Sequence, residues 1–296
     1  MREPPRAAWL GDGSRLHLQH GPIDLVIEAF GQAEAVRAAH QAASRRFDGL
    51  LEALCAELGL LRAPHRPDSP RADSDVARRM QVAVAPHAAG HYITPMAAVA
   101  GAVADAVLAA MVAAAPLRRA YVNNGGDIAL HLADGERFAV GLVDRPDRPG
   151  LFGRGEVASA DPVRGIATSG WRGRSFSLGI ADAVTVLAAD AAAADAAATI
   201  VANAVDLPGH PAIDRRAARD LQPDSDLGDR PVTRHVGPLC PEEIGRALAS
   251  GAAMAQDLAD SGLIVAAALH LAGMTRLVPA SHPLVSPIQP EAVRHA

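Results

Sequence analysis

The sequence is poor in cysteine and in aromatic residues, and these two absences remove whole classes of protein. Cys55 and Cys240 lie far apart and follow no paired spacing, so neither a disulfide framework nor a thiolate zinc site is indicated. Aromatic residues make up 3% of the 296 residues, so stacking platforms for single-stranded nucleic acid are scarce. Any chemistry is therefore expected from oxygen and nitrogen atoms.

The chain also lacks a net positive charge. Its formal net charge is -5, so it has no basic field to hold a polyphosphate backbone, and no nucleic-acid partner is expected. Hydrophobic residues make up 49% and charged residues 21%, the balance of a folded globular protein. The length allows one large domain or two packed halves around a sizeable core.

One segment is apolar enough to be tested as a membrane helix. Residues 93–115 are just long enough to span a bilayer. Alanines, Gly101 and the central Asp105 weaken insertion, because a carboxylate at mid-membrane costs about 2.5 to 3.5 kcal/mol. We predict a buried helix and no membrane partner. Since residues 1–14 are polar and lack the apolar core of a secretory signal, we expect a cytoplasmic protein.

Hydrophobic periodicity predicts alternating groups of strands and helices. Helices are expected at residues 32–61, 96–114 and 191–205, and from 241 onwards. Strands are expected at residues 16–18, 23–29, 120–123, 128–131, 138–143, 165–168, 175–178, 183–187 and 263–271. Two polar stretches, 62–74 and 206–230, are expected to be surface loops of a single 1–296 domain. The order favours an α+β fold with antiparallel sheets and packed helices.

Asp195 and Thr199 form a candidate metal pair. They are four residues apart in an alanine-rich helical stretch, so both side chains lie on one helix face and small neighbours leave room for a ligand. A carboxylate and a hydroxyl are hard oxygen donors, which suit Mg²⁺. The alternative is an exposed acid beside a threonine that bonds back to the preceding helical turn.

A glycine-rich turn is expected between two strands and offers a second candidate site. Glycines let the backbone approach a bound ligand closely, and the flanking polar side chains can contact it. An ordinary hairpin turn would use the same residues. The candidates in this turn are Asn124, Gly125, Gly126 and Asp127.

The predicted strand at 165–168 ends in a turn of Thr168, Ser169 and Gly170. Hydroxyls and free backbone amides at a strand end suit an anionic phosphate. Guanidinium groups nearby would strengthen phosphate binding, although such arginines are often only solvated. The flanking arginines are Arg164, Arg172 and Arg174.

His87 and His91 have the spacing of a helical zinc pair but lack the glutamate that zinc proteases use as general base. Pro86 and Gly90 also disfavour a helix there. The sequence therefore gives little support to a zinc hydrolase.

Four stretches, taken in chain order, resemble the ApbE-like superfamily, whose best-known members are FAD:protein FMN transferases. They are residues 94–105, 124–128, 166–170 and 194–199. The resemblance implies a T-fold-related architecture of two related α+β halves with flavin held in the cleft between them. It implies Mg²⁺ on Asp195 and Thr199, Thr94 near a metal-binding carbonyl, the Asn124 turn on the adenosine side, and the pyrophosphate of FAD at the Thr168 turn.

The chain also departs from the family pattern. Ala100 stands where family transferases have a lysine, and the usual catalytic histidine segment is absent, because residues 177–182 run directly into the next strand. The shortened pattern resembles a cytoplasmic branch of the superfamily without an assigned activity, not its exported lipoproteins. Asp182 is the one acid left in this segment, and it is either a base toward a substrate hydroxyl or a structural residue.

Three functions stay open from the sequence. The first is a metal-dependent transferase or hydrolase that acts on a phosphoanhydride such as FAD. The second is a flavin or nucleotide binding module without turnover, and the third is an enzyme acting on another small anionic metabolite. In each case the expected partner is a small molecule with phosphates, and a homo-oligomer is compatible with all three.

Overall fold

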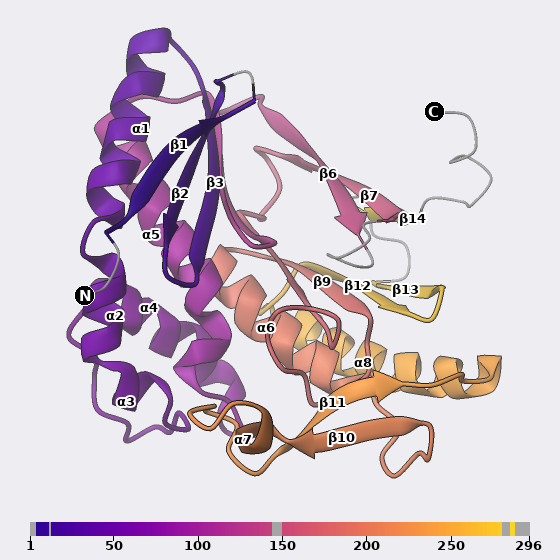
Figure 1. The fold of residues 1–296 in the computed structure, drawn as a ribbon. Coiled ribbons are helices and arrows are strands. Elements are labelled where there is room, and N and C mark those ends of the chain that lie inside the picture. The colour runs from indigo at the N-terminus through magenta and orange to yellow at the C-terminus, as the bar shows by residue number, and fades with distance from the viewer. Residues whose placement is uncertain (1–3, 12, 144–149, 280–284, 288–296) are drawn as a thin grey trace. The chain divides into compact units, whose positions relative to one another are not determined.

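The computed structural model describes residues 4–11, 13–143, 150–279 and 285–287 (Figure 1). The chain divides into two compact units. Unit 1 comprises Met1–Arg137, Ala158–Ala167 and Ala188–Ala196. Unit 2 comprises Phe138–Val157, Thr168–Leu187 and Ala197–Ala296. The expectation that the halves are structurally related stays a prediction.

Unit 1 is built on an antiparallel meander of strands in the order β1-β2-β3-β4-β5. Next to β5, strand β8 (Gly165–Ser169) pairs antiparallel, with Ile128 opposite Ile166. Burial alternates along β3, whose Leu25 and Ile27 are fully buried, because alternate side chains point to opposite faces of the sheet. The meander strands are β1 (Arg6–Leu10), β2 (Arg15–His20), β3 (Ile23–Phe30), β4 (Arg119–Asn124) and β5 (Asp127–Leu132).

Helices α1 and α5 pack on each other and against the strands of unit 1 (Figure 1). Ala39 and Ala43 of α1 are completely buried, which lets the two helices approach closely. The helices of this unit are α1 (Ala33–Phe47), α2 (Leu50–Ala56), α3 (Leu58–Leu61), α4 (Asp75–Val84) and α5 (Val99–Ala114), with short 3₁₀ turns η1 (Ala85–His87) and η2 (Pro95–Ala98).

The stretch Pro95–Ala114 is long and apolar enough to cross a membrane, judged by length and composition alone. Half of its most apolar window is buried inside the protein, where α5 contacts α1, α4, β4 and β5. These contacts are those of a core helix, as the sequence predicts.

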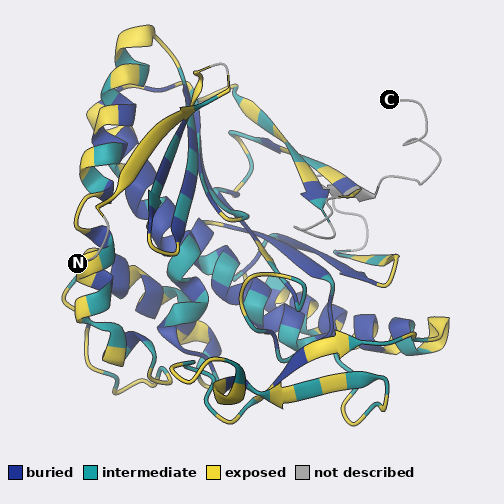
Figure 2. Cartoon of the chain, viewed as in Figure 1, coloured by how far each residue is buried: buried dark blue, intermediate teal, exposed yellow. Residues whose placement is uncertain are grey.

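Unit 2 contains an antiparallel group in the order β9-β12-β13, and every residue of β9 and β12 is buried (Figure 2). Helix α8 packs against β12 and β13. A further sheet has the order β14-β7-β6, and β10 pairs with β11. The elements are β6 (Arg137–Val143), β7 (Leu151–Ala158), β9 (Ala183–Ala188), β10 (Ile213–Ala217), β11 (Pro231–Val236), β12 (Ala266–Leu271), β13 (Met274–Val278), β14 (Val285–Pro287), α6 (Ala191–Ala204), α7 (Ala218–Leu221) and α8 (Pro241–Asp260).

The α+β class with antiparallel sheets is confirmed, and several element assignments are corrected. The expected helix 32–61 is three helices, because Gly49 has a φ of 73° and breaks the first run. The strand expected at 175–178 is wrong. There the Leu178 N–H donates to the Asn203 side-chain oxygen (2.9 Å), so this backbone is tied to α6 and not to a strand. The stretch expected as loop 206–230 contains β10 and α7.

Candidate functional site

The N-terminus of α6 is capped by two aspartates of unit 1. Asp105, on α5, accepts hydrogen bonds from the N–H groups of Ala191 (3.2 Å) and Ala192 (3.0 Å). Asp190 accepts one from the N–H of Ala193 (2.8 Å). The first N–H groups of a helix have no partner within it, so these carboxylates satisfy donors that would otherwise be unpaired.

Within unit 1, the backbone of α5 at Gly101 lies very close to the backbone at the start of α6. A Cβ on Gly101 would overlap the carbonyl group of Ala191, so the contact requires glycine. The same approach lets the Gly101 N–H donate to Oδ2 of Asp195 (3.0 Å). The glycine of the helix motif and the aspartate of the predicted metal pair, distant in sequence, therefore meet.

The surroundings of Asp195 disfavour the charged form of its carboxyl group. Burial, followed by the negative charge of Asp127, raises its pKa well above the usual value, although the N–H groups of Gly101 and Ala100 act in the opposite direction. Among the described residues, no cationic side chain pairs with Asp195. Part of its surface stays accessible, so a proton or a metal cation can reach the carboxylate and relieve this charge.

The glycine-rich turn is a hairpin that also contacts α5. Gly125 (φ 67°) and Gly126 (φ 116°) join β4 to β5, and both angles lie in the left-handed region that glycine adopts without strain. The buried Asn124 donates from Nδ2 to the carbonyl oxygen of Ala100 (3.1 Å). Asn124 faces Asp127 across the strand pair. This turn thus does more than reverse the chain.

These contacts gather Asn124, Asp127 and Asp195 around the start of α5, with Asp105 nearby. Burial, then the charge of Asp190, raises the pKa of Asp105 to about 6. In the described ranges, no three His, Cys, Asp or Glu side chains are grouped to hold a metal. A cation here would need other oxygen donors as well, and Mg²⁺ commonly combines one or two carboxylates with carbonyls, water and phosphates.

The predicted metal site also includes Thr199 of α6 and Thr94, the residue before η2. Thr199 follows Asp195 by one turn of α6, and its hydroxyl has no hydrogen-bond partner within the part of the chain that the structure describes. The alternative of a threonine bonded back to the preceding turn is therefore not observed. Thr94 is buried immediately before η2, where its carbonyl accepts a hydrogen bond from Ala97 (3.1 Å).

The Thr168 turn belongs to unit 2 and is held by short-range contacts. The hydroxyls of Thr168 and Thr185 are 2.9 Å apart, and the N–H of Trp171 donates to the carbonyl of Ala181 (3.0 Å). A Cβ on Gly170 would lie 2.5 Å from the carbonyl oxygen of Asp182, so glycine is needed there. Thr168 is exposed and Ser169 is half-buried, which leaves hydroxyl groups at the surface.

The sequence does not show how firmly Asp182 is engaged. One oxygen accepts hydrogen bonds from Nε1 of Trp171 (3.2 Å) and Nε of Arg172, and the other accepts one from the N–H of Ala272 (2.6 Å). Its side chain is 10% exposed. These contacts describe a brace that ties the loop after Gly170 to the β12–β13 hairpin.

The three flanking arginines differ. The guanidinium of Arg164, in unit 1, donates to the carbonyl oxygens of Ser159 (2.7 Å), Asp161 (2.9 Å) and Val163 (2.6 Å). Its expected contribution to phosphate binding is therefore corrected, because those donors hold a backbone loop. Arg172 pairs with Asp182, whereas Arg174 is exposed.

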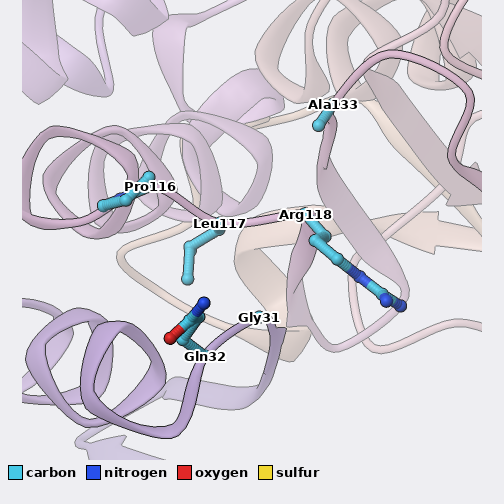
Figure 3. Close-up of a pocket in the computed structure, with 6 residues that line it drawn as sticks. All are labelled: Gly31, Gln32, Pro116, Leu117, Arg118 and Ala133. Carbon is cyan, nitrogen blue, oxygen red and sulfur yellow. The ribbon is translucent and has the colours of Figure 1, made fainter.

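An open hollow of about 560 Å³ occurs elsewhere in unit 1 (Figure 3). Its lining residues are Gly31, Gln32, Pro116, Leu117, Arg118 and Ala133. Arg118 extends away from Gln32, and none of the candidate residues lines the hollow. The candidate residues therefore remain the Asp195 cluster of unit 1 and, separately, the Thr168 turn of unit 2.

The fold and these residues define an α+β protein with a desolvated acidic cluster and a hydroxyl-rich turn. The chain belongs to the AbpE bacteria family, whose model matches residues 7–277. This membership confirms the resemblance to the ApbE-like superfamily.

Relatives include a UPF0280 protein of Methanosphaerula palustris, 40% identical over 152 residues, which cover 48% of this chain and 56% of the relative. A UPF0280 protein of Methanocella arvoryzae is 39% identical over 163 residues, covering 54% of this chain and 63% of the relative. The matches thus span less than two thirds of the length of these relatives.

Two solved structures are also similar. The flavin transferase ApbE from Vibrio cholerae aligns with a TM-score of 0.39 and 13% identity, covering 96% of this chain and 97% of that one. The apo flavinyl transferase ApbE of Pseudomonas stutzeri aligns with a TM-score of 0.38 and 13% identity, covering 98% and 96%.

Proposed function

We propose that this protein binds FAD together with Mg²⁺ and acts on the phosphoanhydride of FAD. One observation carries the proposal: Asp195 is a half-buried carboxylate whose pKa is raised by burial and by the charge of Asp127, and it has no cationic partner among the described side chains. Such a group gains most when a cation binds. Family membership and the resemblance to FMN transferases supply the flavin as the expected ligand.

The residues fit Mg²⁺ by their donor chemistry. Asp195 would supply a carboxylate oxygen and Thr199 a hydroxyl oxygen. A backbone carbonyl near Thr94 would supply a further oxygen ligand. When bound, the metal ion would neutralise charge that develops on a phosphate during cleavage. The N–H of Gly101 fixes the Asp195 carboxylate, so little rearrangement is needed before a cation binds.

The Thr168 turn would hold the phosphates. The exposed Thr168, whose hydroxyl lies 2.9 Å from that of Thr185, and the half-buried Ser169 would face the phosphates, and Gly170 lets the turn lie close to the backbone of Asp182. On the adenosine side we propose Asn124, Gly125, Gly126 and Asp127. We further expect a cytoplasmic location and a protein that is able to form a homo-oligomer.

In the proposed reaction, an oxygen nucleophile attacks the phosphorus of the FMN half of FAD, and the bond to the bridging oxygen breaks. AMP leaves with that oxygen, and FMN passes to water or to an acceptor hydroxyl, whose proton is released. Asp182 is the candidate base. Because both of its oxygens already accept hydrogen bonds, its geometry favours a second candidate function, a flavin-binding module without turnover.

Incubation with FAD and Mg²⁺, followed by chromatography for AMP and a fluorescence assay for protein-bound flavin, separates the candidates. If the protein is an enzyme, AMP should be released by the wild type, not by Asp195→Asn, and still by the control Asp68→Asn, which changes an exposed aspartate. The module predicts FAD binding without AMP. A ligand at a hundred times its dissociation constant stabilises by about 2.7 kcal/mol, so an unchanged melting temperature would instead point to another small anion.

A further inference from the structure

Arg172 occupies a turn whose backbone is fixed on both sides. It follows Gly170 by two residues, and the N–H of Gly173 donates to the carbonyl of Gly170 (3.1 Å), closing a turn around Trp171 and Arg172. Trp171 is itself bonded to the carbonyl of Ala181. The Cα of Arg172 is therefore held close to the end of the hydroxyl-rich turn.

The side chain of Arg172 is fixed on two of its sides. Its Nε donates to Oδ1 of Asp182, and its guanidinium carbon lies 4.3 Å from the centre of the Trp171 ring. Asp182 is restrained in turn, because it also accepts hydrogen bonds from Trp171 and from the N–H of Ala272. A single carboxylate thus sets the direction of the guanidinium.

The outer edge of this guanidinium is free. Within the described ranges, neither Nη nitrogen of Arg172 has a hydrogen-bond partner, and neither is a buried unpaired atom. The side chain is 28% exposed. Arg164 uses its corresponding nitrogens on backbone carbonyls, and Arg174 is exposed without a described partner to orient it.

We propose that Arg172 binds a phosphate oxygen of the ligand through its Nη groups and that Asp182 is its positioning residue. A guanidinium fork matches the geometry of phosphate oxygens, and a pre-oriented fork loses little conformational freedom on binding. The charge of Asp182 is balanced by the inner edge of Arg172, which leaves the donors of the outer edge for an anion. This assignment rests on the proposed function and adds to it the phosphate-recognising side chain.

The test measures dissociation constants for FAD, riboflavin and inorganic pyrophosphate by titration calorimetry at several salt concentrations. Arg172→Gln is expected to weaken FAD and pyrophosphate at least about tenfold, the effect of one charge-assisted contact, and to leave riboflavin unchanged. The slope of FAD affinity against salt should also fall. Arg172→Lys keeps the charge but not the planar fork, so its affinities for FAD and pyrophosphate should lie between those of the wild type and Arg172→Gln. Arg216→Gln replaces an exposed arginine on β10 and should have the affinities of the wild type.

The positioning role of Asp182 has its own readout. Asp182→Asn is expected to weaken FAD and pyrophosphate without changing riboflavin affinity, whereas a purely structural role would affect all three ligands or none. Folding of each variant is checked by its melting temperature, and Arg172→Lys keeps the test decisive if Arg172→Gln does not fold.

The outcomes separate the two proposals. If the protein binds pyrophosphate through Arg172 but does not bind FAD, the role of Arg172 in phosphate binding is supported and FAD is refuted as the ligand. Unchanged FAD and pyrophosphate affinity in Arg172→Gln would overturn the inference even if FAD is cleaved. A wild type that binds neither ligand, or a loss seen in Arg174→Gln in place of Arg172→Gln, would overturn it as well.

Discussion

Replacing Asp105 with asparagine should make the free energy of unfolding less dependent on pH. The pKa of Asp105 is raised to about 6 in the folded protein from the usual 3.8, because burial and then the charge of Asp190 disfavour its ionised form. A raised carboxyl pKa means that the folded state holds the proton more tightly. This contribution to stability is therefore present at low pH and is lost as the pH rises from about 4 to about 6.

The magnitude follows from the shift. A difference of about two pKa units corresponds to roughly 3 kcal/mol, as an upper limit. By linkage, roughly half of this is already lost at pH 5, which leaves about 1.4 kcal/mol to be lost between pH 5 and 7.5. Asparagine keeps one side-chain oxygen for the N–H groups of Ala191 and Ala192, so the variant loses one hydrogen bond, about 1 kcal/mol at every pH.

Urea unfolding of both proteins at half-unit steps from pH 5 to pH 7.5 checks this expectation. The stability of the wild type relative to Asp105→Asn should fall steadily with pH, so that the variant becomes equal or better near neutrality. The slope against urea should stay the same in both proteins. Parallel stability curves would refute the reasoning, because they would show that Asp105 carries no raised pKa.

Two further predictions concern packing. Gly101→Ala should destabilise by about 1 to 3 kcal/mol or more and abolish binding at Asp195, because the new methyl group overlaps the carbonyl of Ala191. The matched control Gly245→Ala, on α8 with open space at its Cβ, should instead stabilise by roughly 0.5 to 1 kcal/mol, and equal unfolding midpoints would contradict both. Asn203→Ala should lower the free energy of unfolding by about 1 to 3 kcal/mol because the partly buried amide of Leu178 loses its acceptor, and an unchanged unfolding midpoint would show that water replaces it.

Local patterns predicted the elements with strong periodicity. The apolar run of α5 and the alternation along β3 each reflect one buried surface, and such patterns are visible within a short window. Strand β1 was not predicted, because residues 6–10 are mostly exposed and carry no alternation. The segment 175–178 looked like a strand because serine alternates with apolar residues in it, but its backbone is bonded to Asn203 of α6, a contact that is distant in sequence.

The candidate site follows the same rule. Helical spacing sufficed to place Asp195 and Thr199 on one helix, and the Gly125 and Gly126 dipeptide sufficed for the hairpin. The role of Asp105 as a cap for α6 could not be predicted, because its partners are more than eighty residues away. The brace around Asp182 depends likewise on Ala272, in a hairpin that follows it by ninety residues.

The most direct test of the central claim is titration calorimetry of Mg²⁺ into the wild type and Asp195→Asn, with and without FAD. The wild type should bind Mg²⁺ more tightly with FAD present, and its affinity should fall as the pH is lowered, because a carboxyl group with a raised pKa must lose its proton to the solvent when the metal binds. Asp195→Asn should show neither the binding nor the pH dependence. Equal Mg²⁺ affinity in both proteins would contradict the assignment of Asp195 as the metal ligand.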